Sequence, residues 1–326
     1  MFESIKKVKE QFLWDPTLQG KPFDFAQVKQ PLRVVVCGMG GSNLASGFLE
    51  MVRPDLDILV HRSYGLPANI KKNDLIIISS YSGNTEEALD SFEKAIGGGF
   101  NTVVISAGGR LLELAKEKQI LYIQPPISNI QPRMATGYSF LAMLKIMGDE
   151  ENLKNAQEFG KNFNPEKFKE EGMMLAEKLQ RKIPIIYASW NNKAIAYAWK
   201  VKINETAKIP AFFNIFPEVN HNEMIGFLTG GTTPEGVCGG AINPCFIFLK
   251  DTTDHQQIQK RMEITEKILK EKGFDFVTTT LNGSKFEKIF NSLTIVDWAS
   301  YNLAKNSGFD PEDSSIIEEF KNKIEF

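Results

Sequence analysis

The chain has few cysteines, almost no net charge and no long apolar run, and each shortage excludes a class of protein. Its three cysteines show no metal-ligand spacing and suit a reducing compartment. A net charge of −2 gives no overall basic field, which argues against nucleic acid as a main partner. No apolar stretch approaches the ~20 residues that a membrane-spanning helix needs. The N-terminus lacks the basic and apolar regions of a signal peptide. We therefore expect a cytoplasmic protein without a membrane anchor.

The usual signatures of nucleotide and metal binding are also missing. Residues 38–43, Gly-Met-Gly-Gly-Ser-Asn, lack the third glycine of the dinucleotide fingerprint, and the segment has no Gly-Lys-Ser/Thr of a P-loop. The chain has only three histidines, and no group of Cys, His and carboxylate residues has ligand spacing. We predict that the protein uses no cofactor and no metal.

What the first half does contain is a regular alternation of strand and helix patterns. Strands are predicted at residues 32–37, 57–61, 74–79, 102–106 and 120–124, with helical patterns between them. This alternation favours a parallel sheet with helices on both faces. A helix from about Arg133 to Met147 follows, and residues 148–152 read as a linker.

The second half repeats the theme, so we predict two related α/β domains, residues 1–150 and 151–326. Its strands are expected at residues 183–188, 211–216, 245–249 and 275–280, and its helices at 165–181, 190–208, 254–272 and 284–305. The glycine-rich run from Gly226 to Gly240 is interpreted as a surface loop, because it is long, contains Pro234 and precedes no helix.

Two strand-to-helix turns in the first half carry hydroxyl groups. The strand ending at Cys37 leads into Gly41 and Ser42, and the strand ending at Ile78 leads into a cluster that includes Ser80, Ser82 and Thr85. Free N–H groups and the dipole at a helix N-terminus favour an anion, and hydroxyl oxygens complete its shell. Because parallel strands end at one sheet edge, both turns can converge on one phosphate. The alternative is that the hydroxyls only cap helices.

These turns, with further segments in the same order, resemble the sugar-isomerase (SIS) domain and, more narrowly, the bifunctional phosphoglucose/phosphomannose isomerases. The likeness is carried by 37–42, 80–85, 131–140, 204–208, 216–222 and 310–321. The resemblance implies two SIS-type domains, each a mainly parallel sheet flanked by helices on both faces. It also implies an aldose–ketose isomerase that interconverts glucose 6-phosphate, and mannose 6-phosphate, with fructose 6-phosphate through a cis-enediol(ate).

The resemblance further implies roles for individual residues. The phosphate site would consist of Gly41, Ser42, Ser80, Ser82 and Thr85. Glu205 would be the base that moves a proton between C1 and C2, and Arg133 the cation that binds an enediolate oxygen or a phosphate. His221, from the neighbouring subunit, and Lys321 would open the sugar ring. Ser314 stands where the family has a threonine that is linked to the acceptance of mannose phosphates.

Each catalytic assignment has a plainer alternative. Glu205 could be a solvated helix carboxylate in contact with Lys202 or Lys208, and the other three residues could be surface or capping groups. The role of His221 implies a homodimer with shared active sites. A strand lies between Glu205 and His221 and carries the chain ~20 Å, which makes it awkward for one subunit to bring both to one sugar. Two other functions stay open: a non-catalytic sugar-phosphate sensor, and another phosphosugar isomerase of the same fold.

Overall fold

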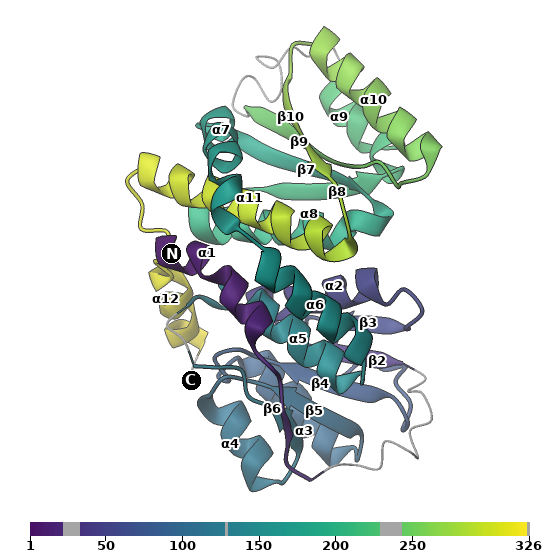
Figure 1. The fold of residues 1–326 in the computed structure, drawn as a ribbon, viewed down its shortest axis with the longest axis vertical. Coiled ribbons are helices and arrows are strands. Elements are labelled where there is room, and N and C mark those ends of the chain that lie inside the picture. The colour runs from purple at the N-terminus through teal and green to yellow at the C-terminus, as the bar shows by residue number, and fades with distance from the viewer. Residues whose placement is uncertain (22–32, 128–129, 229–242, 325–326) are drawn as a thin grey trace. The chain divides into compact units, whose positions relative to one another are not determined.

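The computed structural model describes residues 1–21, 33–127, 130–228 and 243–324, and Figure 1 shows their fold. The chain divides into two compact units. The N-terminal unit is Lys6–Asn164, and the C-terminal unit combines Met1–Ile5 with Pro165–Phe326.

A mainly parallel six-stranded sheet, in the order β1-β6-β5-β4-β2-β3, forms the centre of the N-terminal unit. Its strands are β1 (Leu18–Gln19), β2 (Val34–Cys37), β3 (Ile58–His61), β4 (Leu75–Ser79), β5 (Asn101–Ile105) and β6 (Leu121–Ile123). Strands β2 to β6 run parallel and lie where the sequence predicts them. The sequence does not predict β1, an antiparallel edge strand, because two residues are too few to show a periodic pattern.

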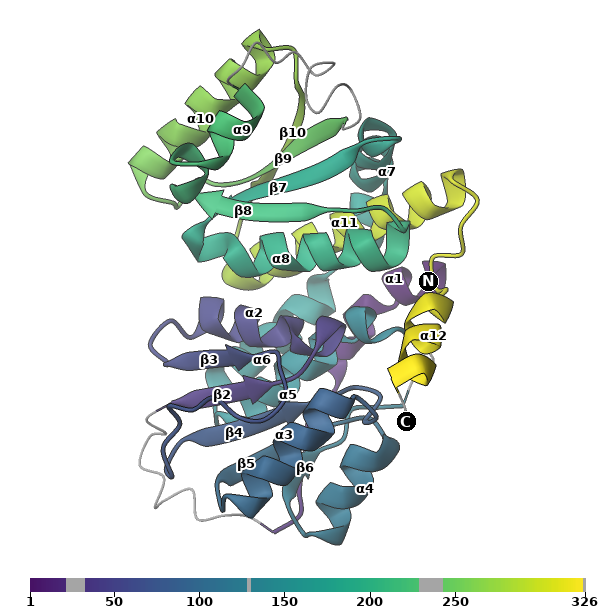
Figure 2. The ribbon, with the colours of Figure 1, turned by 180° about the vertical axis from the view of Figure 1, so that it is seen from behind.

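Helices cover both faces of this sheet (Figure 2). On one face lie α3 (Glu86–Gly97) and α4 (Gly109–Glu117), and on the other lie α2 (Leu44–Val52), α5 (Thr136–Ile146) and α6 (Glu150–Asn162). All residues of β2 and β4 are buried, which explains why these strands read as unbroken apolar runs. Alternate residues, such as Ile76 and Ile78, pack with Phe92 and Leu111 in the core beneath α3 and α4.

Helix α6 lies within the N-terminal unit, although a division of the chain at residue 150 places it in the second domain. The ring of Phe12 contacts the rings of Phe159 and Phe163. A Cβ atom on Gly160 would lie 2.3 Å from the Phe12 Cβ, so the backbone of α6 packs closely against Phe12 of the short 3₁₀ helix η1 (Val8–Leu13). This aromatic packing joins residues far apart in sequence, which composition at the linker does not reveal. The boundary in the structure therefore follows Asn164.

A wholly parallel four-stranded sheet, in the order β10-β9-β7-β8, forms the centre of the C-terminal unit. Its strands are β7 (Ile183–Ser189), β8 (Phe212–Phe216), β9 (Pro244–Asp251) and β10 (Asp275–Leu281). Their positions agree closely with those predicted. Both units are therefore mainly parallel α/β structures, and the predicted fold class is confirmed.

The helices of the C-terminal unit again lie on both faces of its sheet (Figure 2). Helices α9 (Glu223–Leu228) and α10 (Gln256–Glu271) cover a core that includes Tyr187, Phe216, Phe246 and Phe248. Helices α7 (Lys169–Leu179), α8 (Lys193–Lys202) and α11 (Lys285–Asn306) pack together on the other face. The final helix is α12 (Ser315–Ile324), and none of its described residues is buried.

Two predicted elements differ from the structure. The single helix expected over residues 190–208 is α8 between a 3₁₀ turn, Trp190–Asn192, and a π-turn, η6 (Ile203–Ala207). Apolar periodicity does not separate these hydrogen-bond patterns, because their turns differ by less than one residue from an α-turn. In the glycine-rich run interpreted as a loop, Gly226 to Leu228 are helical in α9, and residues 229–240 lie outside the described ranges.

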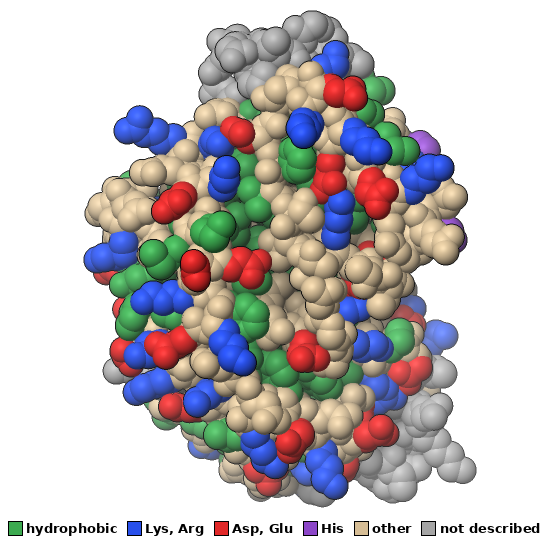
Figure 3. Space-filling model, turned by 45° about the horizontal axis from the view of Figure 1, so that its top comes forward, with side chains coloured by type: hydrophobic (Ala, Val, Ile, Leu, Met, Phe, Trp, Pro, Cys, Tyr) green, Lys and Arg blue, Asp and Glu red, His purple; other side chains and the backbone are tan. Residues whose placement is uncertain are grey.

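No helix within the described ranges is long and apolar enough to cross a membrane. Figure 3 shows one face of the molecule, on which Lys and Arg side chains are interspersed with Asp and Glu. This mixed pattern agrees with the small net charge of the chain.

Candidate functional site

The two hydroxyl-bearing turns of the N-terminal unit are bonded to each other. The Ser42 Oγ accepts a hydrogen bond of 3.0 Å from the Tyr81 N–H, and the Ser79 Oγ donates one of 2.9 Å to the Ser42 carbonyl oxygen. Ser42 lies in a 3₁₀ turn, η2 (Gly40–Asn43), that follows β2 and leads into α2. Because β2 and β4 are adjacent parallel strands, both turns lie at the same sheet edge, as the sequence leads us to expect.

The hydroxyl groups of the second turn bond to each other rather than capping the helix. The Ser80 Oγ lies 3.0 Å from the Thr85 Oγ1 and accepts a 3.1 Å hydrogen bond from the Gly83 N–H. Thr85 is the N-cap residue of α3, yet its side chain makes no capping hydrogen bond to the described backbone. Ser82 is exposed, and its Oγ accepts a hydrogen bond of 3.4 Å from the Asn84 N–H. Helix capping alone therefore does not account for these hydroxyls.

Glycine is required where these turns touch their neighbours. A Cβ on Gly41 would lie 2.4 Å from the backbone nitrogen of Arg133, so the turn after β2 is pressed against the segment that carries this arginine. Gly83 has a φ of +75°, and a Cβ there would lie 1.8 Å from the Gly108 carbonyl oxygen. Close packing thus fixes both turns, as a rigid anion site needs.

Arg133 is buried beside the first turn. It lies in a 3₁₀ turn, η3 (Pro132–Met134), and only 2 % of its surface is exposed. Its guanidinium is within 3.5 Å of the Gln131 Oε1. A buried arginine is not an ordinary surface cation, so the alternative interpretation of Arg133 is wrong. The structure therefore brings Gly41, Ser42, Ser80, Ser82, Thr85 and Arg133 into one region of the N-terminal unit.

Glu205 lies in the π-turn that follows α8, and its side chain is partly buried. Lys202 and Lys208, the two lysines that the sequence places beside this carboxylate, each make a bond to another group. The Lys202 Nζ lies 2.7 Å from the Asp297 Oδ1 in a buried ion pair, and the Lys208 Nζ donates a 2.7 Å hydrogen bond to the Glu205 carbonyl oxygen. The residue thus lies in an irregular turn, of a kind frequent at functional sites, and not on a regular helix surface.

Asp313, the residue before Ser314, is joined to the Glu205 segment through Lys208. Besides Glu205, the Lys208 ammonium donates a hydrogen bond to the carbonyl oxygen of Asp313. Ser314 is partly buried, and its own carbonyl oxygen accepts the first backbone hydrogen bonds of α12. The Ser315 N–H donates to the Asp313 carboxylate, and this bond, with the Lys208 charge, holds the pKa of Asp313 below its ordinary value. The C-terminal unit therefore places Ser314 near the backbone of the predicted base.

His221 is exposed on a turn whose flanking residues are anchored. The turn links the 3₁₀ helix η7 (Glu218–Asn220) to α9. On one side, the Asn220 side chain bonds to Arg261 at 3.2 Å and to Thr265 at 3.1 Å. On the other, Glu223 accepts a 2.8 Å hydrogen bond from the Tyr187 hydroxyl. The flanks of the turn are thus anchored, while His221 itself is exposed.

The C-terminal unit does not bring Glu205 and His221 together. They lie at opposite ends of β8, Glu205 before its first residue and His221 beyond its last. Five strand residues span ~17 Å, which is more than two side chains bridge to reach one sugar carbon.

Lys321 lies on the surface of α12 in an ion pair of 2.8 Å with Glu318, three residues earlier. Its side chain is 53 % exposed, and this is the environment of an ordinary charged helix end. Its role in ring opening stays a prediction.

The carboxyl edge of the second sheet carries charged groups that the sequence does not reveal. Asp251, at the end of β9, is bonded to the Lys288 ammonium at 2.8 Å and to the Asn192 amide at 3.3 Å. Burial acts to raise the pKa of Asp251, but the bonds to Lys288 and Thr253 outweigh it and lower the pKa. Burial raises the pKa of the neighbouring Asp254. The negative charge of these two carboxylates disfavours a second phosphate site at this edge. The sequence does not reveal the cluster, because its residues come from three different elements.

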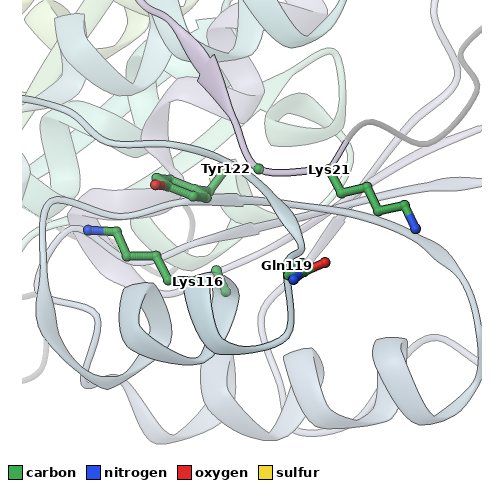
Figure 4. Close-up of a pocket in the computed structure, with 6 residues that line it drawn as sticks. Lys21, Lys116, Gln119 and Tyr122 are labelled. Atoms are coloured by element: carbon green, nitrogen blue, oxygen red, sulfur yellow. The ribbon is translucent and has the colours of Figure 1, made fainter.

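In the described part of the chain, no group of three or more His, Cys, Asp and Glu residues could hold a metal ion. Figure 4 shows a pocket that is lined by residues from the region of β1, α4 and β6: Gly20, Lys21, Ala115, Lys116, Gln119 and Tyr122. The Lys116 ammonium lies 5.6 Å from the Tyr122 ring centroid. This pocket contains none of the predicted site residues.

Comparison with known proteins shows which family this fold and these segments belong to. The family model described as the bacterial phospho-glucose isomerase C-terminal SIS domain matches residues 168–324. A bifunctional phosphoglucose/phosphomannose isomerase of Aquifex aeolicus is 35% identical over 337 residues, which cover 99% of this chain and 98% of the relative. The chain belongs to the bifunctional phosphoglucose/phosphomannose isomerase family. A family member from Caldicellulosiruptor bescii is 33% identical over 344 residues, with 99% and 98% of the two chains covered.

More distant relatives share the fold of this isomerase family. A D-glucosamine-6-phosphate 4-epimerase of Sulfolobus acidocaldarius is 31% identical over 206 residues, 62% of this chain and 66% of the relative. Among solved structures, a glucosamine-6-phosphate deaminase from Thermotoga maritima matches with a TM-score of 0.65 at 15% identity, covering 95% of this chain and 96% of that one. The structural likeness supports the fold alone.

Proposed function

We propose that this protein is an aldose–ketose isomerase that interconverts glucose 6-phosphate and mannose 6-phosphate with fructose 6-phosphate through a cis-enediol(ate). The observation that carries the proposal is the pair of bonded turns after β2 and β4 in a member of this family. The chemistry needs a phosphate anchor, a base and a cation, and the chain offers a candidate for each without a metal or an organic cofactor.

The phosphate anchor consists of Gly41, Ser42, Ser80, Ser82 and Thr85. These residues precede the N-termini of α2 and α3, where free N–H groups favour an anion. The Ser80 and Thr85 hydroxyls, which bond to each other in this structure, would each turn to a phosphate oxygen. Hydrogen bonds to a charged acceptor are stronger than a bond between two neutral hydroxyls, so this exchange is favourable.

Glu205 acts as the base that removes a proton from C1 or C2 and returns it to the other carbon. One carboxylate suffices, because the proton leaves one carbon and returns to the other on the same face of the planar cis-enediol(ate). Arg133 stabilises the negative charge that develops on the enediolate oxygen. Its burial makes this electrostatic contribution larger than it would be in water.

His221 opens the sugar ring in the active site of a partner subunit, so the protein acts as a homodimer. Two observations support this assignment: the imidazole is exposed on an anchored turn, and β8 separates it from Glu205 of its own chain. Lys321 assists ring opening, and the Ser314 hydroxyl replaces the family threonine in accepting mannose phosphate. The enzyme acts in the cytoplasm. In support of this location, its described cysteines, Cys37 and Cys245, are buried free thiols, which suit a reducing compartment.

The decisive experiment measures isomerisation and solvent exchange with purified protein in the presence of a chelator. We expect interconversion of all three hexose phosphates and deuterium incorporation at C2 of the aldose product in D₂O. Glu205→Gln should lower kcat by at least ~10²-fold, the usual size of a general-base contribution, and abolish the exchange. Glu177→Gln, on the exposed side of α7, is the matched control and should leave both unchanged.

Four outcomes would contradict the proposal. Wild-type exchange in Glu205→Gln would assign the base to another residue. Binding of a hexose phosphate without turnover would identify a sensor, and 4-epimerisation of glucosamine 6-phosphate without isomerisation would identify the other chemistry of the relatives. Activity lost with the chelator and restored by a divalent ion would show that a metal takes part.

A further inference from the structure

Lys208 ends the π-turn that carries Glu205 in an unusual backbone conformation. Its φ and ψ are +61° and +31°, in the left-handed region. Residues with a Cβ seldom adopt this conformation because it is sterically unfavourable, and it persists only where the surrounding structure fixes it.

The side chain of Lys208 folds back onto the turn that it ends. Its ammonium donates a 2.7 Å hydrogen bond to the carbonyl oxygen of Glu205 and a second bond to the carbonyl oxygen of Asp313. Carbonyl groups near a helix end lack partners within the helix, so a cation is well placed to bond to them. Hydrogen bonds from a charged donor are stronger than neutral ones. One side chain thus joins two backbone segments that are about a hundred residues apart.

Both joined segments lie next to residues of the proposed reaction. Glu205 is the proposed base, and Asp313 directly precedes Ser314, the proposed specificity residue. Two more contacts hold the turn. The Ala211 N–H donates a 2.7 Å hydrogen bond to the Asn204 side chain, and the buried pair of Lys202 and Asp297 holds the end of α8 on α11. Lys208 is the member of this set that reaches across to Asp313.

We propose that Lys208 is a positioning residue, which sets the distance between Glu205 and the Asp313–Ser314 segment without touching the substrate. This proposal rests on the proposed function. A base displaced by about 1 Å loses roughly 10²-fold in rate, since proton transfer depends on near-contact geometry. Substrate binding depends mainly on the phosphate turns in the N-terminal unit. Loss of the Lys208 bonds should therefore lower kcat and leave KM nearly unchanged.

Lys208→Met keeps the length of the side chain and removes the ammonium. We expect kcat to fall about 10- to 100-fold for both aldose phosphates, with KM changed by less than about threefold. Lys208→Arg restores a donor to two carbonyls and should recover part of kcat. Lys200→Met is the matched control, because Lys200 lies on α8 and bonds to neither segment in the described structure. It should resemble the wild type.

Hydrogen exchange tests the link independently of activity. In Lys208→Met, amides in residues 203–208 and 313–318 should exchange faster, while those of the N-terminal unit should not change. Unchanged exchange in both segments would overturn the link. Faster exchange with unchanged kcat, or a rise in KM alone, would overturn the positioning role. If the wild-type protein isomerises no hexose phosphate, the proposed function fails, and with it the positioning of a base, while hydrogen exchange still reports the link.

Discussion

Thr85 occupies the N-cap position of α3 but directs its hydroxyl to Ser80 and not to the helix backbone. Its loss should therefore affect ligand binding more than stability. We expect Thr85→Ala to raise KM about tenfold, because a hydrogen bond to a charged group contributes about 1.5–3 kcal/mol. Steady-state kinetics with fructose 6-phosphate measures this change.

The control for this substitution is Thr280→Ala, which removes an exposed hydroxyl from β10 in the C-terminal unit. The control should retain the wild-type KM. A Thr85→Ala protein with an unchanged KM, or with its main defect in thermal stability, would identify the Thr85 hydroxyl as structural.

Single residues differ in how far the sequence reveals their surroundings. The turns containing Ser42 and Ser80 follow apolar strands directly, so their place at one sheet edge can be predicted. The burial of Arg133 cannot be predicted in this way, because it depends on the close approach of the Arg133 backbone to Gly41, about ninety residues earlier in the chain. The Asp251 cluster is hidden for the same reason, since Lys288 and Asn192 come from other elements.

At the scale of elements, the end of α8 depends on the buried ion pair between Lys202 and Asp297. Both side chains are almost fully buried, at 1 % and 5 % exposure. Removing one partner leaves a buried charge without compensation, which typically destabilises a protein by roughly 3–5 kcal/mol. We expect Lys202→Met and Asp297→Leu each to lower the urea midpoint of the C-terminal unit markedly.

The double variant, Lys202→Met with Asp297→Leu, should be more stable than either single variant, because it leaves neither charge in the core. Lys161→Met is the control, since its partner Glu158 and Lys161 itself are both 63 % exposed. Exposed pairs contribute little, so this variant should unfold like the wild type. Single variants that unfold with the wild-type midpoint would show that the pair is not needed for stability.

The sequence predicts the strands better than it predicts the irregular elements. The central strands are buried on both faces and read as short apolar runs between turns, as in β4. The π-turn and the edge strand β1 have no such signature, because their geometry comes from tertiary bonds, such as those of Lys208 and Asn204. Helix α6 packs with the N-terminal unit, beyond the predicted division at residue 150, for a similar reason, which is its aromatic contact with Phe12.

At the scale of the whole molecule, the separation of Glu205 from His221 leads to a test of the proposed shared site. We expect inactive Glu205→Gln protein and inactive His221→Ala protein to recover activity when their subunits are allowed to exchange. In a mixed dimer, one of the two sites combines an intact Glu205 with an intact His221. Random exchange of equal amounts should therefore restore about a quarter of the sites.

The measurement is specific activity against time after mixing, with subunit exchange followed independently by mass spectrometry of labelled chains. A mixture of Glu205→Gln with an Arg133→Met variant is informative as a second pairing, because it tells which chain supplies Arg133. Complete exchange without recovery of activity in the first mixture would mean that His221 serves its own subunit or takes no part.

The two units also differ in when they can form during synthesis. The N-terminal unit is one continuous stretch, Lys6–Asn164, so its sheet can close while the remainder of the chain is still being made. The C-terminal unit needs Met1–Ile5 as well, and the Phe2 ring packs 5.3 Å from the ring of Trp298 on α11. At about 5–20 residues per second, Trp298 emerges roughly 15–60 s after Phe2. The Phe2 ring therefore stays without its Trp298 partner over that interval, and the C-terminal unit can close only after α11 has been made.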